Sequence, residues 1–197
     1  MSFLQGRDMK KTVERIFAES IDVKQKTLKK NLPEIIGAVE AVIKAFKTGH
    51  KLFFCGNGGS AADSQHIAAE FVGRFQKERK AWPAIALTTD SSALTALGND
   101  YSFEIVFSRQ LQALGQKGDV LIAISTSGNS KNILAAVKEA KTMGITTIGV
   151  TGGSGGQLAA VSDIPIVAAS SITARVQESH LVIFHTICEL VENVLTS

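Results

Sequence analysis

The chain has 197 residues, a length that suits one globular domain with a core of its own. Apolar residues make up 45% of the chain and charged residues 20%, which is typical of globular proteins. The net charge of +3 suits an anionic metabolite. It comes from dispersed Lys and Arg rather than from a dense basic stripe, so we expect no nucleic-acid partner.

The two cysteines, Cys55 and Cys188, lie far apart in the chain. Two isolated cysteines form neither a disulfide framework nor a Cys-based zinc site, which favours a reducing compartment. The first residues lack the apolar core of a signal peptide, and no stretch approaches the roughly 18–20 apolar residues that span a bilayer. We therefore expect a cytoplasmic protein without a membrane partner.

Residues 1–50 predict two helices. Apolar residues recur at helical spacing from 8 to 30 and again from 33 to 49. Asn31 and Pro33 separate these stretches, and Pro33 suits the first turn of a helix. We expect an antiparallel helical hairpin, whose apolar face either covers the sheet or packs against another subunit.

The segment from Lys51 to Glu70 predicts a strand, a glycine turn and a helix. The apolar run 52–55 suits a buried strand, and the glycines within 56–59 allow backbone to approach a ligand closely. Ser60 is the expected N-cap of an Ala-rich helix. A glycine turn before a helix N-terminus is an anion site, because N–H groups and the positive end of the helix dipole face the same point.

Two ionisable residues follow this anion site. His66 and Glu70 are four residues apart, so they share one face of the predicted helix. A phosphate anchor beside an ionisable pair predicts a small phosphorylated substrate. A histidine satisfied in the core or at an interface is the alternative interpretation of His66.

The rest of the chain alternates between short strands and helices. We predict strands at 84–87, 119–125, 146–150 and 164–167, and helices shortly after 90 and at 132–143, 157–161 and 176–195. This alternation predicts right-handed crossovers and a parallel sheet with ligands at the carboxyl ends of its strands. We expect a single α/β domain over residues 1–197, a three-layer flavodoxin-like or Rossmann-like fold. Its core is 51–197, with a long C-terminal helix.

A second polar turn follows the strand predicted at 119–125. Its sequence STSGNS places hydroxyls at Ser125, Thr126, Ser127 and Ser130. Such a turn, next to a helix N-terminus, can hold a phosphate without a cationic side chain. An ordinary polar turn with a serine cap is the alternative, but four hydroxyls exceed what capping requires.

The sequences CGNGGSAADSQH at 55–66 and AISTSGNS at 123–130 resemble the sugar isomerase (SIS) domain. The resemblance is closer to the phosphoheptose isomerase family and includes PAIALTTD at 83–90, GND at 98–100 and RVQESH at 175–180. It implies interconversion of sedoheptulose 7-phosphate and D-glycero-D-manno-heptose 7-phosphate, the first step towards heptose in lipopolysaccharide and related surface glycans. It also implies a homotetramer with active sites at subunit contacts.

The resemblance assigns roles to individual residues. The substrate-binding positions of the family match Asn57, Gly58, Gly59, Glu70, Asn99, Asp100, Ser125, Thr126, Ser127, Ser130 and Gln177. The zinc ligands of those members that hold one ion per subunit match His66, Glu70, Gln177 and His185. The catalytic pair matches Glu70 and His185.

These residue types suit an aldose–ketose isomerisation. A proton moves between C1 and C2 through an enediol(ate), which needs a base beside the carbon and an acid for the oxygens. A carboxylate can be the base and an imidazole can carry the oxygen proton near neutral pH. Gln is a weak zinc ligand. Gln177 precedes His185 by about 12 Å of ideal helix, so both reach one ion only if Gln177 lies at or before the helix start or if two subunits contribute.

Four positions need separate comment. His185 lies in an apolar helix, where its ring needs a partner, although packing alone is an alternative. We expect His180 to be structural and His50 to be solvated. Position 174 is Ala, where some family members carry an acid before the Arg; if that acid orients a catalytic group, its loss lowers activity or moves the task to another residue.

Other functions compete with the isomerase. The spacing of Gly56, Gly58 and Ala61 matches a loose dinucleotide fingerprint, with Asp90 as the ribose-binding acid, but a dehydrogenase leaves the serine turn unexplained. A relative that bridges molecules of the replication initiator protein has this fold without the catalytic Glu and His. A scaffold of that kind and a sugar-phosphate sensor are the remaining alternatives.

Overall fold

The computed structural model describes residues 6–197, with side chains from Asp8 onward. Within that range one parallel five-stranded sheet has the order β2-β1-β3-β4-β5. Its strands are β1 (Leu52–Cys55), β2 (Ala84–Ala86), β3 (Val120–Ile124), β4 (Thr146–Gly152) and β5 (Ile164–Ala168). This order is the flavodoxin-like arrangement, so the predicted sheet is confirmed. Each predicted strand lies within two residues of its observed bounds.

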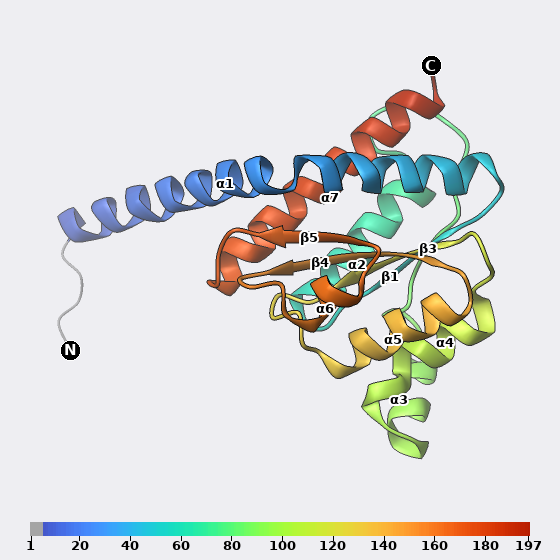
Figure 1. The fold of residues 1–197 in the computed structure, drawn as a ribbon. Coiled ribbons are helices and arrows are strands. Elements are labelled where there is room, and N and C mark those ends of the chain that lie inside the picture. Colours follow the sequence, from blue (N-terminus) through green and yellow to red (C-terminus); the bar gives the residue numbers. More distant parts are fainter. Residues whose placement is uncertain (1–5) are drawn as a thin grey trace.

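Helices cover both faces of the sheet (Figure 1). The helices are α1 (Gly6–Lys47), α2 (Gly59–Val72), α3 (Ser91–Asp100), α4 (Val106–Leu114), α5 (Lys131–Thr142), α6 (Gly156–Val161) and α7 (Thr173–Leu195), with a 3-10 turn η1 (Phe103–Ile105). Helices α1, α2 and α7 form one core with the sheet, and α4, α5 and α6 form the other. Helix α4 was not predicted from the sequence. None of the helices within residues 6–197 is long and apolar enough to cross a membrane.

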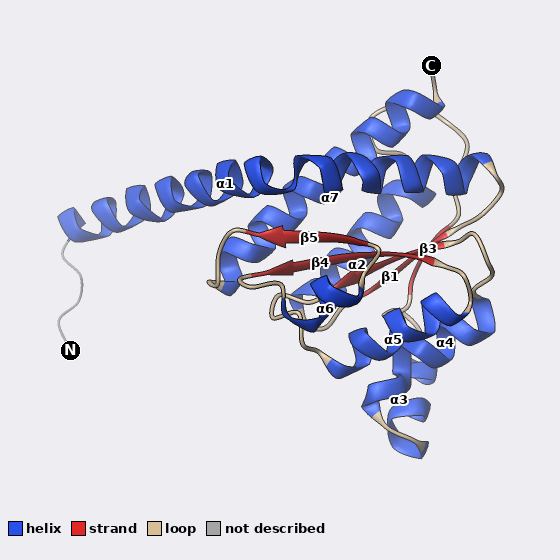
Figure 2. Ribbon diagram, viewed as in Figure 1, coloured by secondary structure: helices blue, strands red, loops and turns tan. Residues whose placement is uncertain are grey.

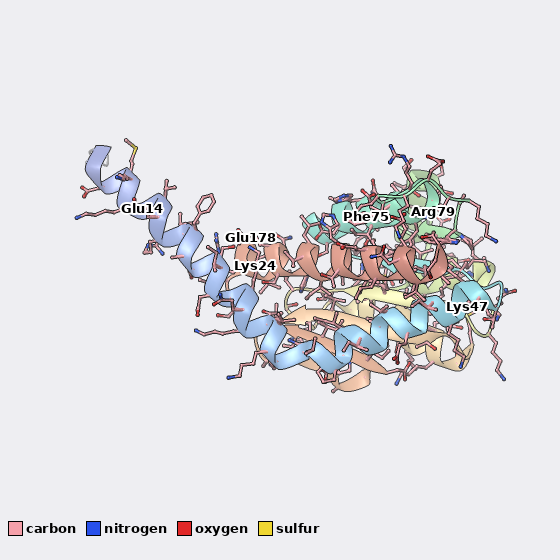
Figure 3. The ribbon with its side chains drawn as sticks, turned by 90° about the horizontal axis from the view of Figure 1, so that it is seen from above. Glu14, Lys24, Lys47, Phe75, Arg79 and Glu178 are labelled. Atoms are coloured by element: carbon pink, nitrogen blue, oxygen red, sulfur yellow. The ribbon has the colours of Figure 1, made fainter. Side chains whose placement is uncertain are left out.

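The predicted N-terminal hairpin is wrong. Helix α1 bends at Asn31, whose backbone has φ −123° and ψ 17°, and then continues without reversing (Figure 1). Figure 3 shows Glu14 and Lys47 at opposite ends of this bent helix. A reversal needs a loop of a few residues between the helices, whereas here a single residue leaves the helical conformation. Pro33 fits because it begins the part after the bend, where its missing N–H is tolerated.

The bend fastens α1 to the edge of the sheet. The side-chain amide of Asn31 donates to the Val167 carbonyl at 3.0 Å and accepts the Val167 N–H at 2.8 Å. The Thr27 hydroxyl accepts the Ala169 N–H at 3.0 Å. The side chains of α1 therefore satisfy backbone groups of β5 and of the residue after it, which a sheet edge otherwise leaves unpaired.

The two parts of α1 differ in what they cover. After the bend, Ile35, Val39 and Val42 are buried against the sheet. Before it, the helix extends beyond the body of the protein (Figure 1), and Phe17 is 67% exposed. Of the two expectations for this apolar face, sheet covering therefore holds for the residues after the bend. Before the bend, Val23 and Thr27 are still buried, whereas Val13, Phe17 and Ile21 are exposed.

A buried ion pair joins the segment after α2 to α7. Glu192 of α7 accepts the Arg79 Nε–H at 3.2 Å and the N–H groups of residues 75–77. The Arg79 guanidinium also donates to the carbonyls of Glu70 and Phe71 at 2.7 and 2.8 Å. A cation is thus placed at the negative end of α2. Figure 3 shows Phe75 and Arg79 on the segment beside α7.

Glu192 is ionised in this setting. Burial alone raises the pKa of a carboxyl, but the N–H groups of residues 75–77 and the Arg79 cation together hold the pKa of Glu192 below its usual range. The pair is therefore a charged contact that fixes the C-terminal end of α2 against α7.

Two histidines outside the predicted site are structural. His180 is fully buried and its Nε2 lies 3.0 Å from the Thr151 carbonyl oxygen. Burial lowers the pKa of His180 to about 4, although the Thr151 carbonyl opposes this change. The expectation that His50 is solvated is wrong: its half-buried ring packs against Gly118, with Nδ1 3.6 Å from an Asp119 carboxylate oxygen.

The Arg79–Glu192 pair predicts a large effect of Glu192→Gln. The change leaves the Arg79 cation buried without its partner, and breaking such a pair lowers the free energy of unfolding by about 3 kcal/mol. Urea denaturation measures the loss. Glu189→Gln, at an exposed position of the same helix, is the control and should change stability by less than about 0.5 kcal/mol. Equal stability of the two variants would contradict this interpretation.

His180 predicts a loss of stability in acid. Its pKa is about 4 in the folded protein and 6.5 when unperturbed, so the unfolded chain gains a proton between these values and the folded chain does not. The stabilisation is complete above pH 6.5 and falls by about 1.4 kcal/mol per pH unit below it, until pH reaches about 4. Urea denaturation at several pH values should show a shallower acid slope in His180→Asn. Equal slopes would refute the assignment.

Candidate active site

The turns after β1, β3 and β4 lie at the same end of the sheet, beyond the carboxyl ends of the parallel strands. The arrowheads of β4 and β5 in Figure 2 point towards that end. Strands β1 and β3 are neighbours, and Cys55 at the end of β1 is paired with Ala123 near the end of β3. Ligands of such sheets bind outside the carboxyl ends of the strands, where the strand order reverses. Both turns that were predicted to bind substrate lie at this position.

The glycines of the turn after β1 occupy positions that disfavour a side chain, by overlap or by backbone conformation. A Cβ at Gly56 would overlap the Ser60 carbonyl, and Gly58 has a φ of 55°, in the left-handed region. Gly58 is the N-cap of α2 and the helix begins at Gly59. The prediction that Ser60 is the N-cap is therefore wrong, because Ser60 is buried inside the first turn.

Gln177 lies against this turn in the same chain. A Cβ at Gly59 would overlap the Gln177 side-chain amide, so the amide rests on the start of α2. Gln177 is inside α7 rather than at or before its start. Of the two conditions under which Gln177 and His185 can share an ion, only a contribution from two subunits is therefore left.

The serine turn after β3 gathers three of its four predicted hydroxyls. The Ser125 Oγ lies 3.0 Å from the Ser130 Oγ and 3.4 Å from the Ser127 Oγ. Ser130 is the N-cap residue of α5, yet its hydroxyl does not cap the helix. It is directed at Ser125 instead. The structure shows no such contact for the half-buried Thr126 among the residues it describes.

The turn after β4 and the start of α6 pack against the serine turn and fix its backbone. Gly128 has a φ of 69°, a Cβ there would overlap the Gly155 carbonyl, and the Leu158 N–H donates to the Gly128 carbonyl at 2.8 Å. The Asn129 side chain accepts the Gln157 N–H at 3.1 Å. The hydroxyls are therefore pre-positioned at the N-terminus of α5, an arrangement that suits a phosphate group.

The ionisable residues lie farther along α2, where it faces α7. His66 Nε2 is 3.2 Å from a Glu70 carboxylate oxygen. The rings of His66 and His185 meet edge to face, with centroids 5.2 Å apart. His66 is thus the common neighbour of both predicted catalytic residues. Within the described residues the ring of His185 packs on the His66 ring and on Phe75, whose ring centroid is 5.5 Å away, and it makes no hydrogen bond.

Two more groups lie near this cluster. Burial, aided by the Glu70 carboxylate, raises the pKa of Cys188 to about 12, so the thiol stays neutral. Asp63 is one turn before His66 on α2. Burial raises the pKa of Asp63, although His66 opposes this change, and its Oδ2 has no hydrogen-bond partner among the described residues. Sequence reasoning missed Asp63, although its three-residue spacing from His66 places both on one helix face.

The cluster has part of what a zinc ion requires. Two ligands of one tetrahedral zinc, each about 2.0–2.2 Å from it, are separated by about 3.3 Å, and His66 and Glu70 have this separation. Two imidazoles and a carboxylate are ordinary zinc ligands. Within residues 6–197, however, no three His, Cys, Asp or Glu form a ready-made metal cluster. The predicted four-ligand set is not assembled inside one chain.

Asn99 and Asp100 lie elsewhere in this chain. Both are exposed at the end of α3, where the Asn99 amide donates to the Asp100 carboxylate at 2.9 Å. Helix α3 packs mainly on η1 and α4. Within residues 6–197, no hydrogen bond joins either side chain to the serine turn or to the histidine cluster.

Known proteins share this sequence and fold. Residues 16–152 match the SIS domain. A phosphoheptose isomerase of Clostridium acetobutylicum is 53% identical over 189 residues, 95% of this chain and 96% of that protein. Phosphoheptose isomerase structures from Neisseria gonorrhoeae and Francisella tularensis are 44% and 38% identical. Both have a TM-score of 0.89; they cover 94% and 93% of this chain, and this chain covers 99% and 97% of theirs. The chain belongs to the phosphoheptose isomerase family of SIS-domain proteins.

Proposed function

We propose that this protein is the isomerase that interconverts sedoheptulose 7-phosphate and D-glycero-D-manno-heptose 7-phosphate. The observation that carries the proposal is the cluster of Glu70, His66 and His185 on facing surfaces of α2 and α7, in a member of this family. The product would supply heptose for lipopolysaccharide or a related surface glycan. The two buried free cysteines support a reducing, cytoplasmic setting.

The site residues divide the reaction between them. The hydroxyls of the serine turn bind the phosphate and so fix the far end of the sugar. Glu70 removes the proton from one of the two reacting carbons and returns it to the other. The His185 imidazole moves the proton between the two oxygens, which an imidazole can do near neutral pH. The side chain of Glu70 is 25% exposed, so the surrounding helices exclude much of the water.

The two ends of the site are far apart in one chain. Gly59 begins α2 at the end that carries the glycine turn, and it is separated from Glu70 by about 16 Å along the helix. An extended seven-carbon sugar phosphate spans only about 10 Å, given carbon–carbon bonds of about 1.5 Å. This difference supports active sites at subunit contacts, where one copy supplies the phosphate end and another supplies Glu70 and His185. Asn99 and Asp100 would then also reach the sugar of a neighbouring copy.

The surface of the chain supports association into a homotetramer. An apolar groove of about 320 Å³ lies between α1 and α7, and its lining includes Leu28, Leu32, Ile36, Val182 and Leu190. The part of α1 before the bend adds exposed Phe17 and Ile21. Contiguous apolar surface of this kind marks sites of protein association.

We also propose zinc as the cofactor, one ion per subunit. His66, Glu70 and His185 would hold it, and Gln177 of a second copy would complete the set. When bound, the ion supplies a Lewis acid that polarises the carbonyl and stabilises the enediolate.

The alternative functions have less support. Asp90, the candidate ribose-binding acid, is the N-cap of α3 and accepts the Ala93 N–H at 2.9 Å, so it is already engaged. A scaffold or a sensor has no need for an acid–base cluster. Position 174 is Ala where some family members carry an acid, and the half-buried Asp63, one turn before His66 on α2, is a candidate to take over an orienting role.

Glu70→Gln tests the proposed base. The amide keeps the shape of the carboxylate but cannot take up the proton, so turnover of sedoheptulose 7-phosphate should fall by about 10²–10⁴-fold. Calorimetry should show binding of the same ligand within a few-fold of wild type. Glu189→Gln should retain full activity. A wild-type protein that binds the sugar phosphate without forming aldose would instead favour the sensor, and one that neither binds nor isomerises it would favour the scaffold.

Metal removal tests the zinc proposal. Elemental analysis of the purified protein should find about one zinc per chain, and His66→Ala should reduce that content, because it removes one imidazole of the set. Dialysis against a chelator should lower activity, and added zinc should restore it. A metal-free protein whose activity is unchanged by chelator and by zinc would refute this part of the proposal.

A further inference from the structure

The glycine turn and the serine turn are joined by a pair of asparagines. The Asn57 amide donates to the Asn132 side-chain oxygen at 2.9 Å, and the Asn132 amide donates to the Asn57 side-chain oxygen, also at 2.9 Å. Asn57 lies two residues after β1, and Asn132 is the second residue of α5, directly behind the serine turn. Each side chain therefore satisfies a donor and an acceptor of the other.

Helix capping does not explain Asn132. The N-cap of α5 is Ser130, and the side chain of Asn132 makes no backbone hydrogen bond within the described part of the chain. Asn132 is nevertheless 4% exposed. An apolar side chain would fill a buried position at a lower desolvation cost, so the polar pair indicates a requirement beyond packing.

The pair also determines how Asn57 can meet a ligand. One N–H and one lone pair of the Asn57 amide are used by Asn132, which leaves one N–H and one lone pair. A reciprocal pair couples the orientations of the two amides, because flipping one amide alone would set donor against donor and acceptor against acceptor. The other side of the serine turn is already fixed by Gly128 and Asn129. The asparagine pair therefore links the two turns beyond the point where the pairing of β1 with β3 ends.

We propose that Asn132 is a positioning residue that holds the glycine turn at a fixed distance from the serine turn and orients the Asn57 amide towards the sugar phosphate. This inference rests on the proposed function, since it concerns the same ligand. Its role is to make the two turns act as one binding surface. A ligand that spans both turns depends on this residue, whereas a ligand held by the serine hydroxyls alone does not.

Two variants and two ligands test the proposal. Asn132→Asp keeps the size but cannot donate to Asn57, and Asn132→Leu removes both hydrogen bonds. Calorimetry should show sedoheptulose 7-phosphate binding weakened at least tenfold in both variants, with inorganic phosphate binding within threefold of wild type. Turnover should fall by about 10–100-fold, because small misplacements of a bound substrate have effects of that size.

Asn31→Asp is the matched control. Asn31 is also buried and also makes a two-way hydrogen-bonded contact, but with the backbone of Val167 in β5 rather than with the glycine turn or the serine turn. It should lower the melting temperature and leave the ratio of the two affinities unchanged. Folded Asn132 variants that weaken both ligands equally, or neither, would overturn the proposal. If wild type binds the sugar phosphate without isomerising it, the proposed function fails, yet the affinity ratio still tests Asn132.

Discussion

The guanidinium of Arg79 is the contact on which the candidate acid–base cluster depends. It binds the last carbonyls of α2, including that of Glu70 itself, and it pairs with Glu192 of α7. Helix α2 carries Glu70 and α7 carries His185, so one buried cation fixes the two surfaces on which the chemistry is proposed to occur. A hydrophobic contact would hold the helices together but would not set their relative position along the axis. A multidentate guanidinium does both.

The site is arranged along α2 as two separate regions. The N-terminal end of the helix, with the glycine turn and the neighbouring serine turn, suits an anion. The C-terminal end, with its histidines and carboxylates, suits proton transfer. Glycines permit the first region because side chains would overlap the Ser60 carbonyl and the Gln177 amide. Helical spacing creates the second, since His66 and Glu70 share a face. A parallel packing of α2 and α7 then brings His185 to that face.

Much of this could be predicted from the sequence, because local signals were strong. Apolar runs such as 52–55 located the strands. The glycine and serine turns located the candidate ligand site at the carboxyl ends of those strands. His66 and Glu70 were found by their four-residue spacing. The hairpin prediction failed because Asn31 and Pro33 look like a loop, and the contact of Asn31 with β5 that makes it a bend is 136 residues away in the chain. Asn132 was missed for a related reason: its burial and its hydrogen-bonded partner Asn57 across the fold are not visible in a local pattern. Asp63 shares a helix face with His66, but the burial of one of its carboxylate oxygens could not be seen from that spacing.

Asn31 has a consequence for how chains can assemble. By pairing with Val167, it occupies backbone groups through which β5 would otherwise recruit a strand from another molecule. The opposite edge, β2, is three residues long and offers little for such recruitment. Growth of an extended ribbon through the sheets is thereby disfavoured, and contacts between copies are directed to the helical surfaces. Interfaces between helices can close on themselves by symmetry, which gives a particle of finite size instead of a fibre.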